Sequence, residues 1–117
     1  MIISIACFTY IVSDIARARA FYEGVLGFKL ETDFRGEWLE YDIGGGTFAI
    51  TTMDMMHKPG VKGGIIAFEV DDLDKTLAHL KASNVPFALE ACETPVCRLA
   101  VVQDPDGNDI VIHKRKS

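Results

Sequence analysis

The feature of this sequence that most limits its possible folds is an order of elements that occurs twice. In each half, an apolar run typical of a strand ends at a valine, an aspartate follows, and an amphipathic helical pattern comes next. Aligning the halves superposes four pairs of residues: Val12 with Val70, Asp14 with Asp72, Ile15 with Leu73 and, approximately, Phe28 with Phe87. Because element order, capping acid and spacing all coincide, we interpret the chain as an internal duplication.

The spacing of apolar residues predicts the elements of each repeat. A helix is expected from residue 15 to Gly27 and another from residue 73 to about Asn84. The glycines at 44–46 indicate a hairpin turn and not a phosphate-binding loop, because no helix follows them. The predicted strands are 2–12, 28–33, 37–43 and 47–53, then 64–70, 87–91, 98–103 and 109–113. We therefore expect a single α+β domain with module one at about 1–53, a connector at 54–62 and module two at about 63–117.

Length and charge exclude several classes of protein. At 117 residues the chain is one folding unit, and a net charge of −5 argues against a nucleic-acid partner. Apolar runs are all shorter than the ~20 residues that span a bilayer, so no membrane partner is expected. The apolar first twelve residues lack a basic leader and a cleavage site, which favours a buried strand over a signal peptide. The odd set Cys7, Cys92 and Cys97 indicates free thiols and predicts a cytoplasmic protein.

Three motifs in order give the chain a family resemblance. They are residues 12–15 (VSDI) followed by 21–28 (FYEGVLGF), residues 68–73 (FEVDDL), and residues 104–108 (DPDGN). In a duplicated chain of this length, the set resembles the vicinal oxygen chelate superfamily, which includes glyoxalase I, extradiol dioxygenases, fosfomycin-resistance enzymes and bleomycin-binding proteins. The resemblance implies two βαβββ modules that form a curled, cup-like mixed sheet with the helices outside. It also implies a homodimer.

The same resemblance implies where a metal would be held, and the residues there do not suit one. In metal-dependent members, His and Glu ligands come from the first and last strands of each module. Those positions correspond here to Cys7, Ile65, Ile50 and Val111. A single thiol cannot build a metal site, and the histidines lie elsewhere, at 57, 79 and 113. We therefore predict no metal and no cofactor.

Strand alternation predicts which side chains line the pocket instead. Trp38 and Tyr41 fall on opposite faces of one strand, and the indole is the better candidate for the inward face. Arg98 should point the other way, toward an acid or a dimer mate. The predicted ligand-binding residues are Cys7, Thr9, Trp38, Ile50, Ile65, Cys97, Leu99, Val101, Val111 and His113.

Two of these residues carry reactive groups, and each has two interpretations. A nearby His113 would lower the thiol pKa of Cys97 and create a nucleophile, which makes both weak catalytic candidates. Alternatively, Cys97 is a small buried hydrophobe and His113 a half-solvated strand end. Hairpin pairing places His113 opposite Leu99 or Val101, diagonal to Cys97, which favours the second interpretation.

Four functions remain open from the sequence. The favoured one is a metal-free protein of the glyoxalase/bleomycin-resistance type that binds an aromatic or amphipathic small molecule in an apolar cup. The alternative is a glyoxalase- or dioxygenase-like enzyme with a non-standard active site. A metal-free enzyme that uses His113 or Cys97, and a regulatory module with a vestigial cup, complete the set. Whether any reaction is catalysed is not decided by these residues.

Overall fold

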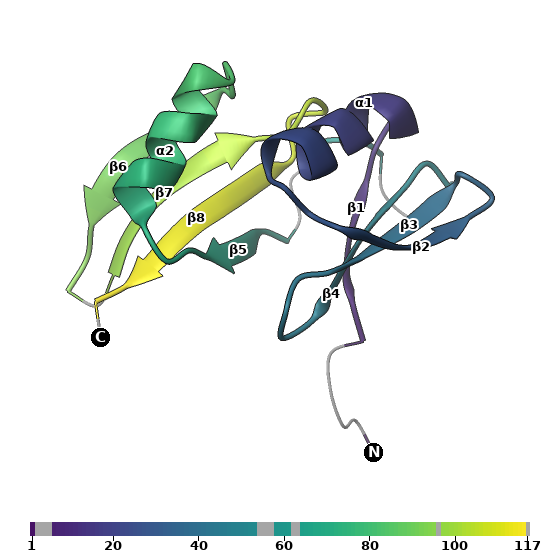
Figure 1. Ribbon diagram of the computed structural model, residues 1–117, viewed down its shortest axis with the longest axis horizontal. Coiled ribbons are helices and arrows are strands. Elements are labelled where there is room, and N and C mark those ends of the chain that lie inside the picture. Colours follow the sequence, from purple (N-terminus) through teal and green to yellow (C-terminus); the bar gives the residue numbers. More distant parts are fainter. Residues whose placement is uncertain (2–5, 54–57, 62–63, 96, 117) are drawn as a thin grey trace. The chain divides into compact units, whose positions relative to one another are not determined.

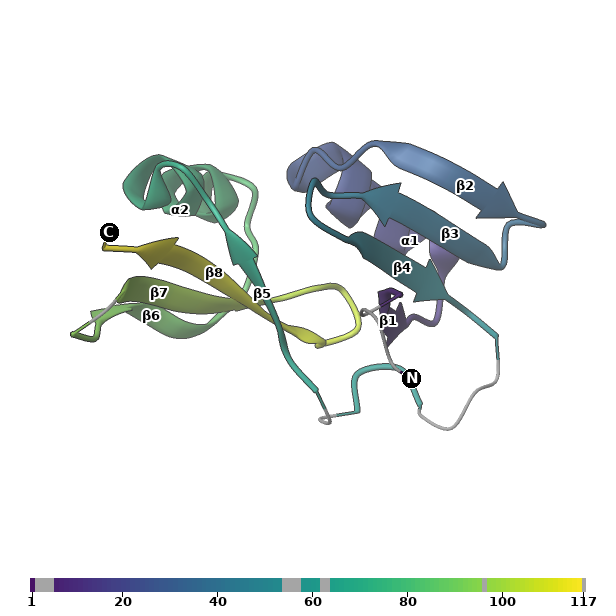
Figure 2. The same ribbon diagram turned by 90° about the horizontal axis from the view of Figure 1, so that it is seen from below.

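The computed structural model describes residues 1, 6–53, 58–61, 64–95 and 97–116. The chain divides into two compact units, Met1–Val61 and Lys62–Ser117. Each unit contains one four-stranded sheet and its own helical segment (Figures 1 and 2). The architecture is therefore α+β, as the sequence predicts.

The elements follow the same order in both units. The first contains β1 (Phe8–Ile11), α1 (Ile15–Arg19), the π-helix η1 (Ala20–Val25), β2 (Leu30–Phe34), β3 (Trp38–Asp42) and β4 (Thr47–Thr51). The second contains β5 (Ile66–Glu69), α2 (Leu73–Ala82), β6 (Phe87–Glu93), β7 (Cys97–Gln103) and β8 (Asp109–Arg115). The predicted connector residues 54–57, with Met55, Met56 and His57 among them, lie outside the described residues.

Strand pairing shows the duplication most directly. The sheets have the orders β1-β4-β3-β2 and β5-β8-β7-β6. In each, the first and last strands of the unit pair in parallel, and the remaining neighbours pair antiparallel. A parallel pair needs a long crossover connection. The helix supplies part of that crossover and covers one face of its sheet, leaving the other face without a helix.

In the first unit, local chemistry sets the start of the helix and a widened turn sets its packing. The Asp14 side chain caps α1 by accepting the backbone N–H of Arg17 at 3.1 Å. The π-helical turn that follows lets the consecutive residues Phe21 and Tyr22 both be buried. The ring of Tyr22 lies 4.9 Å, centroid to centroid, from that of Phe48 on β4. An aromatic core therefore fills the space between the helix and the sheet.

The second unit repeats this design with aliphatic side chains. Asp72 caps α2 by accepting the backbone N–H of Lys75 at 3.0 Å. One helix face is buried at Leu73, Leu77 and Leu80, and it covers the sheet face that carries the buried side chains of β8. Burial of such side chains contributes about 1.5–3 kcal/mol each. Within the described residues, neither unit has a helix with the length and apolar character needed to cross a bilayer.

Candidate functional site

Most of the predicted ligand-binding residues lie on the sheet faces that the helices leave uncovered. In the first unit, Thr9 lies on this face of β1, because it alternates with the buried Tyr10 of the helix-covered face. The Cys7 sulfur lies 3.6 Å from the Thr9 hydroxyl oxygen, so the two side chains are neighbours. Cys7 and Thr9 therefore point to the same side of the sheet, as strand alternation predicts.

Trp38 and Tyr41 lie on opposite faces of β3, as the alternation predicts. The Tyr41 side chain is fully buried beneath the helix. The indole of Trp38 is half-buried on the uncovered face, where its Nε1–H donates to Glu40 Oε2 at 2.8 Å. In strand register, Trp38 is flanked by Thr51 and by the exposed Phe34. This face thus places a carboxylate beside an aromatic surface.

The register of β4 corrects one predicted position by one residue. Ile50 pairs with Tyr10 and Leu39 and is fully buried on the helix-covered face. Ala49 pairs with Thr9 and takes the uncovered face instead. The parallel pairing of the second unit matches Val111 with Ala67 in the same way, so Ala49 is the structural counterpart of Val111.

In the second unit, the uncovered face is an apolar strip with polar residues at one end. Val101 and Val111 are paired across β7 and β8, and Leu99 is paired with His113 in the next row. All four side chains are partly exposed. Ile65, just before β5, is 50% exposed. The sequence therefore predicted correctly that Leu99, Val101, Val111 and His113 share a face; that they contact a ligand stays a prediction.

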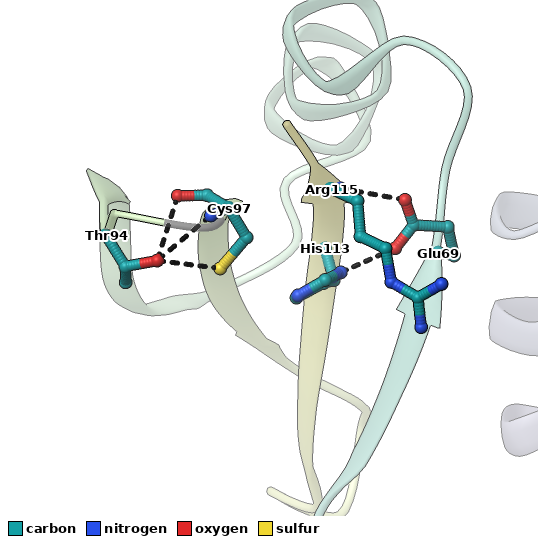
Figure 3. Close-up of polar contacts among 5 residues, drawn as sticks. All are labelled: Glu69, Thr94, Cys97, His113 and Arg115. Carbon is teal, nitrogen blue, oxygen red and sulfur yellow. Dashed lines mark hydrogen bonds and ion pairs between the residues drawn. The ribbon is translucent and has the colours of Figure 1, made fainter. Parts of the chain in front are cut away.

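The two candidate catalytic residues have different hydrogen-bond partners. Cys97 is buried, and its sulfur lies 3.1 Å from the hydroxyl oxygen of Thr94 (Figure 3). Its backbone N–H also donates to that oxygen, at 3.0 Å. In register, Cys97 is opposite Arg115 and diagonal to His113, as expected from the hairpin. These contacts favour a structural role for Cys97 at the end of the hairpin over a nucleophile activated by His113.

The partner of His113 is Glu69, which the sequence analysis did not single out. His113 Nδ1 and Glu69 Oε1 are in hydrogen-bond contact, and the backbone N–H of Arg115 donates to Glu69 Oε2 at 2.8 Å (Figure 3). The Arg115 N–H and then the His113 imidazole hold the pKa of the Glu69 carboxyl below its usual range. We name this arrangement the Glu69–His113 pair. The signal that would have revealed it is the parallel pairing of β5 with β8.

The donor set at the family's metal positions does not fit a metal. With the corrected register, the four positions hold Cys7, Ala49, Ile65 and Val111. One thiol and three hydrocarbons offer a single ligand, whereas bound divalent metals take four or more. Across the described ranges, no three His, Cys, Asp or Glu side chains are grouped so that they could hold an ion.

Other polar pairs on the helix-covered sides stabilise the elements behind these faces. Arg98 points toward α2, where its guanidinium lies 2.9 Å from Asp74, so the expected pairing with an acid is present. In the first unit, Glu23 accepts from Tyr41 at 2.8 Å and from Arg19 at 2.7 Å. The Arg19 hydrogen bond is the main reason that the pKa of the Glu23 carboxyl is lowered. These contacts tie helix to sheet.

Comparison with known proteins agrees with the topology. The family model described as "Glyoxalase/Bleomycin resistance protein/Dioxygenase superfamily" matches residues 4–112. The chain belongs to this superfamily.

Three similar proteins show how close the resemblance is. TnmS3, described as an antibiotic binding protein from Streptomyces sp. CB03234, is 30% identical, with 99% of each chain covered and a TM-score of 0.86. A glyoxalase/bleomycin resistance protein from the same Streptomyces strain is 31% identical over 93% of this chain and 98% of its own, with a TM-score of 0.79. The uncharacterized protein YaeR of Escherichia coli K12 is 29% identical over 90% of this chain and 91% of its own.

Proposed function

We propose that this chain is a small-molecule-binding protein of the glyoxalase/bleomycin-resistance type that works without a metal. The observation that carries the proposal is the replacement of the family's metal ligands by Cys7, Ala49, Ile65 and Val111. At these four positions, the uncovered sheet faces lack the donors on which the family's metal chemistry depends. The similarity to an antibiotic-binding protein over nearly the whole chain supports binding as the retained activity.

The chemistry of the uncovered faces favours an aromatic or amphipathic ligand. Leu99, Val101 and Val111 offer a partly exposed apolar strip, and Trp38 offers an aromatic surface beside a carboxylate. Ligand pockets in proteins are mostly apolar with a few polar groups that fix orientation. Each face has this composition.

Two further properties belong to the proposal. The three cysteines are free thiols in the structure, which suits a reducing, cytoplasmic location. A homodimer is expected from the resemblance, and Phe34 and Leu89 are exposed apolar side chains that association would bury. Light scattering after gel filtration measures the assembly state, and a monomer at all concentrations would contradict this part.

The decisive experiment is a thermal-shift screen of the metal-stripped protein against aromatic antibiotics and metabolites. A ligand at a hundred times its Kd stabilises the native state by about 2.7 kcal/mol, which corresponds to a shift of several degrees. Compounds that stabilise the protein should also change the fluorescence of Trp38, the chain's single tryptophan. Adding zinc, nickel or manganese should change neither result.

A pair of matched variants tests whether a ligand binds on the uncovered face of the second unit. Leu99→Asn places a polar group within the apolar strip and should weaken binding of a confirmed ligand. Val61→Asn makes the same kind of change at a 51% exposed residue outside the strands and should leave binding unchanged. A stoichiometric divalent ion that binding requires would overturn the proposal, as would a broad panel without a single stabilising compound.

A further inference from the structure

The Glu69–His113 pair is held more firmly than a surface ion pair usually is. Both carboxylate oxygens of Glu69 are used, one by the imidazole Nδ1 and the other by the backbone N–H of Arg115. The two residues are 44 positions apart in sequence and meet because β5 and β8 are paired in parallel. Figure 3 shows the carboxylate beside β8, between these two partners. The orientation of the imidazole is therefore fixed from one side.

This contact determines what the other side of the ring can do. An ionised carboxylate accepts hydrogen bonds and cannot donate them. We therefore assign the proton of the neutral imidazole to Nδ1, which leaves a lone pair on Nε2. The structure gives Nε2 no hydrogen-bond partner among residues 1, 6–53, 58–61, 64–95 and 97–116. The ring thus presents a hydrogen-bond acceptor whose direction is set.

Two of the side chains that neighbour His113 on this face are apolar. Leu99 is the in-register neighbour of His113 on β7, and Val111 is two residues earlier on the same face of β8. The basic residue of the neighbouring strand β7 is Arg98, whose guanidinium is directed at Asp74 on α2. Arg115, two residues after His113, is the charged neighbour on this face of β8. The apolar strip therefore ends at the imidazole of His113, and Arg115 follows it on the same face.

We propose that the Glu69–His113 pair recognises the hydroxyl group of an aromatic ligand whose ring lies on the strip of Leu99, Val101 and Val111. Nε2 accepts the hydroxyl hydrogen, and Glu69 keeps the imidazole in the tautomer that can accept it. This inference rests on the proposed binding function and adds a chemical class of ligand to it. It makes Glu69 a positioning residue, since it acts through His113 and does not touch the ligand.

The test compares two probes that differ in one hydrogen-bond donor. 2-Naphthol carries a hydroxyl, and 2-methoxynaphthalene has the same ring system with that hydroxyl methylated. Affinities for both are measured at pH 8 by probe fluorescence, with chemical shifts of the His113 ring nitrogens as the second readout. We expect the wild-type protein to bind 2-naphthol about tenfold more tightly, the ratio that one hydrogen bond supports.

Two variants test whether the Glu69–His113 pair causes the difference in affinity between the two probes. His113→Phe keeps an aromatic ring without an acceptor and should reduce the ratio to about one. Glu69→Gln replaces one carboxylate oxygen by an NH2 donor. With its oxygen on the Arg115 N–H and its NH2 facing Nδ1, this side chain favours the tautomer with the proton on Nε2, which cannot accept a hydroxyl hydrogen, so the ratio should fall at least about threefold. Glu90→Gln removes the charge of another surface carboxylate, one paired with Lys81, and should leave the ratio unchanged.

Each outcome decides the inference. Equal affinity for both probes in the wild-type protein would overturn recognition of the hydroxyl while leaving apolar binding, and so the proposed function, in place. Failure of the wild-type protein to bind either probe at its solubility limit would overturn this inference, whereas the proposed function is overturned only if the broad thermal-shift panel also contains no stabilising compound. If His113→Phe does not fold, the ratio of the two probe affinities in Glu69→Gln tests the inference. A ratio that persists in Glu69→Gln while the unfolding temperature falls would show that the pair only joins β5 to β8.

Discussion

Replacing Tyr41 by Phe tests the polar contact that joins the helix of the first unit to its sheet. Tyr41 is fully buried, and its hydroxyl donates to Glu23 Oε2 at 2.8 Å. The change removes this donor and keeps the ring, which stacks on Phe48. No cavity larger than a hydroxyl group is created, so the loss reports the hydrogen bond.

The structure sets the size of the loss. A hydrogen bond to a charged group contributes about 1.5–3 kcal/mol. The Glu23 side chain is 26% exposed and retains Arg19, so water can take the place of the hydroxyl in the variant. We therefore expect the lower end, a loss of about 1.5 kcal/mol at pH 7. With a urea m-value of about 1.5 kcal/mol per molar, the unfolding midpoint falls by about 1 M.

The loss of stability in Tyr41→Phe should depend on pH, and the ionisation of Glu23 sets its direction. The hydrogen bond from Arg19 and that from Tyr41 lower the pKa of the folded Glu23 carboxyl against the opposing effect of burial. A lowered pKa adds stability above the unfolded value of about 4.3, and this contribution disappears as the pH falls through the folded pKa. The difference between wild type and Tyr41→Phe should therefore be largest at neutral pH and shrink in acid.

The assay is urea unfolding followed by the fluorescence of Trp38, which reports on the first unit because it lies on β3. Glu23→Gln serves as the companion variant. Combined with Tyr41→Phe, it should cost less than the sum of the two single changes. A variant as stable as wild type at pH 7, or a loss of equal size at pH 7 and pH 2.5, would refute the reasoning.

Three further outcomes are expected. Asp72→Ala removes the cap of α2 and should lower the unfolding free energy by about 1 kcal/mol, measured by urea titration followed by circular dichroism; an unchanged midpoint would contradict the assigned cap. Ile50→Glu buries a carboxylate beneath the helix and should prevent folding, whereas Val111→Glu lies on an uncovered face and should preserve the native circular dichroism spectrum. An equal loss of the native circular dichroism spectrum in the two variants would refute the corrected register. Trp38→Phe should release Glu40 from its indole partner and weaken the binding of an aromatic ligand severalfold in thermal-shift titrations; an unchanged affinity would show that the indole does not contact the ligand.

Features that depend only on residues close together in the chain are predicted correctly from the sequence. Asp14 and Asp72 were predicted as helix caps, and both are, because a cap depends on residues within one turn. Alternation along β3 placed Trp38 and Tyr41 on opposite faces for the same reason. The one-residue shift at Ile50 shows the boundary of this approach. Ile50 was assigned to the pocket from the family resemblance, and only the pairing of β4 (Thr47–Thr51) with β1 shows that Ala49 shares a face with Thr9.

The sequence by itself determined the duplicated βαβββ architecture and the helix starts, since each depends on residue type and local spacing. Tertiary structure decided the register of β4 and the meeting of Glu69 with His113. Both are set by parallel pairing between the first and last strands of a unit, which lie far apart in the chain. Local sequence carries little information about such pairing, because the hydrogen bonds that form it are made by backbone groups that every residue shares.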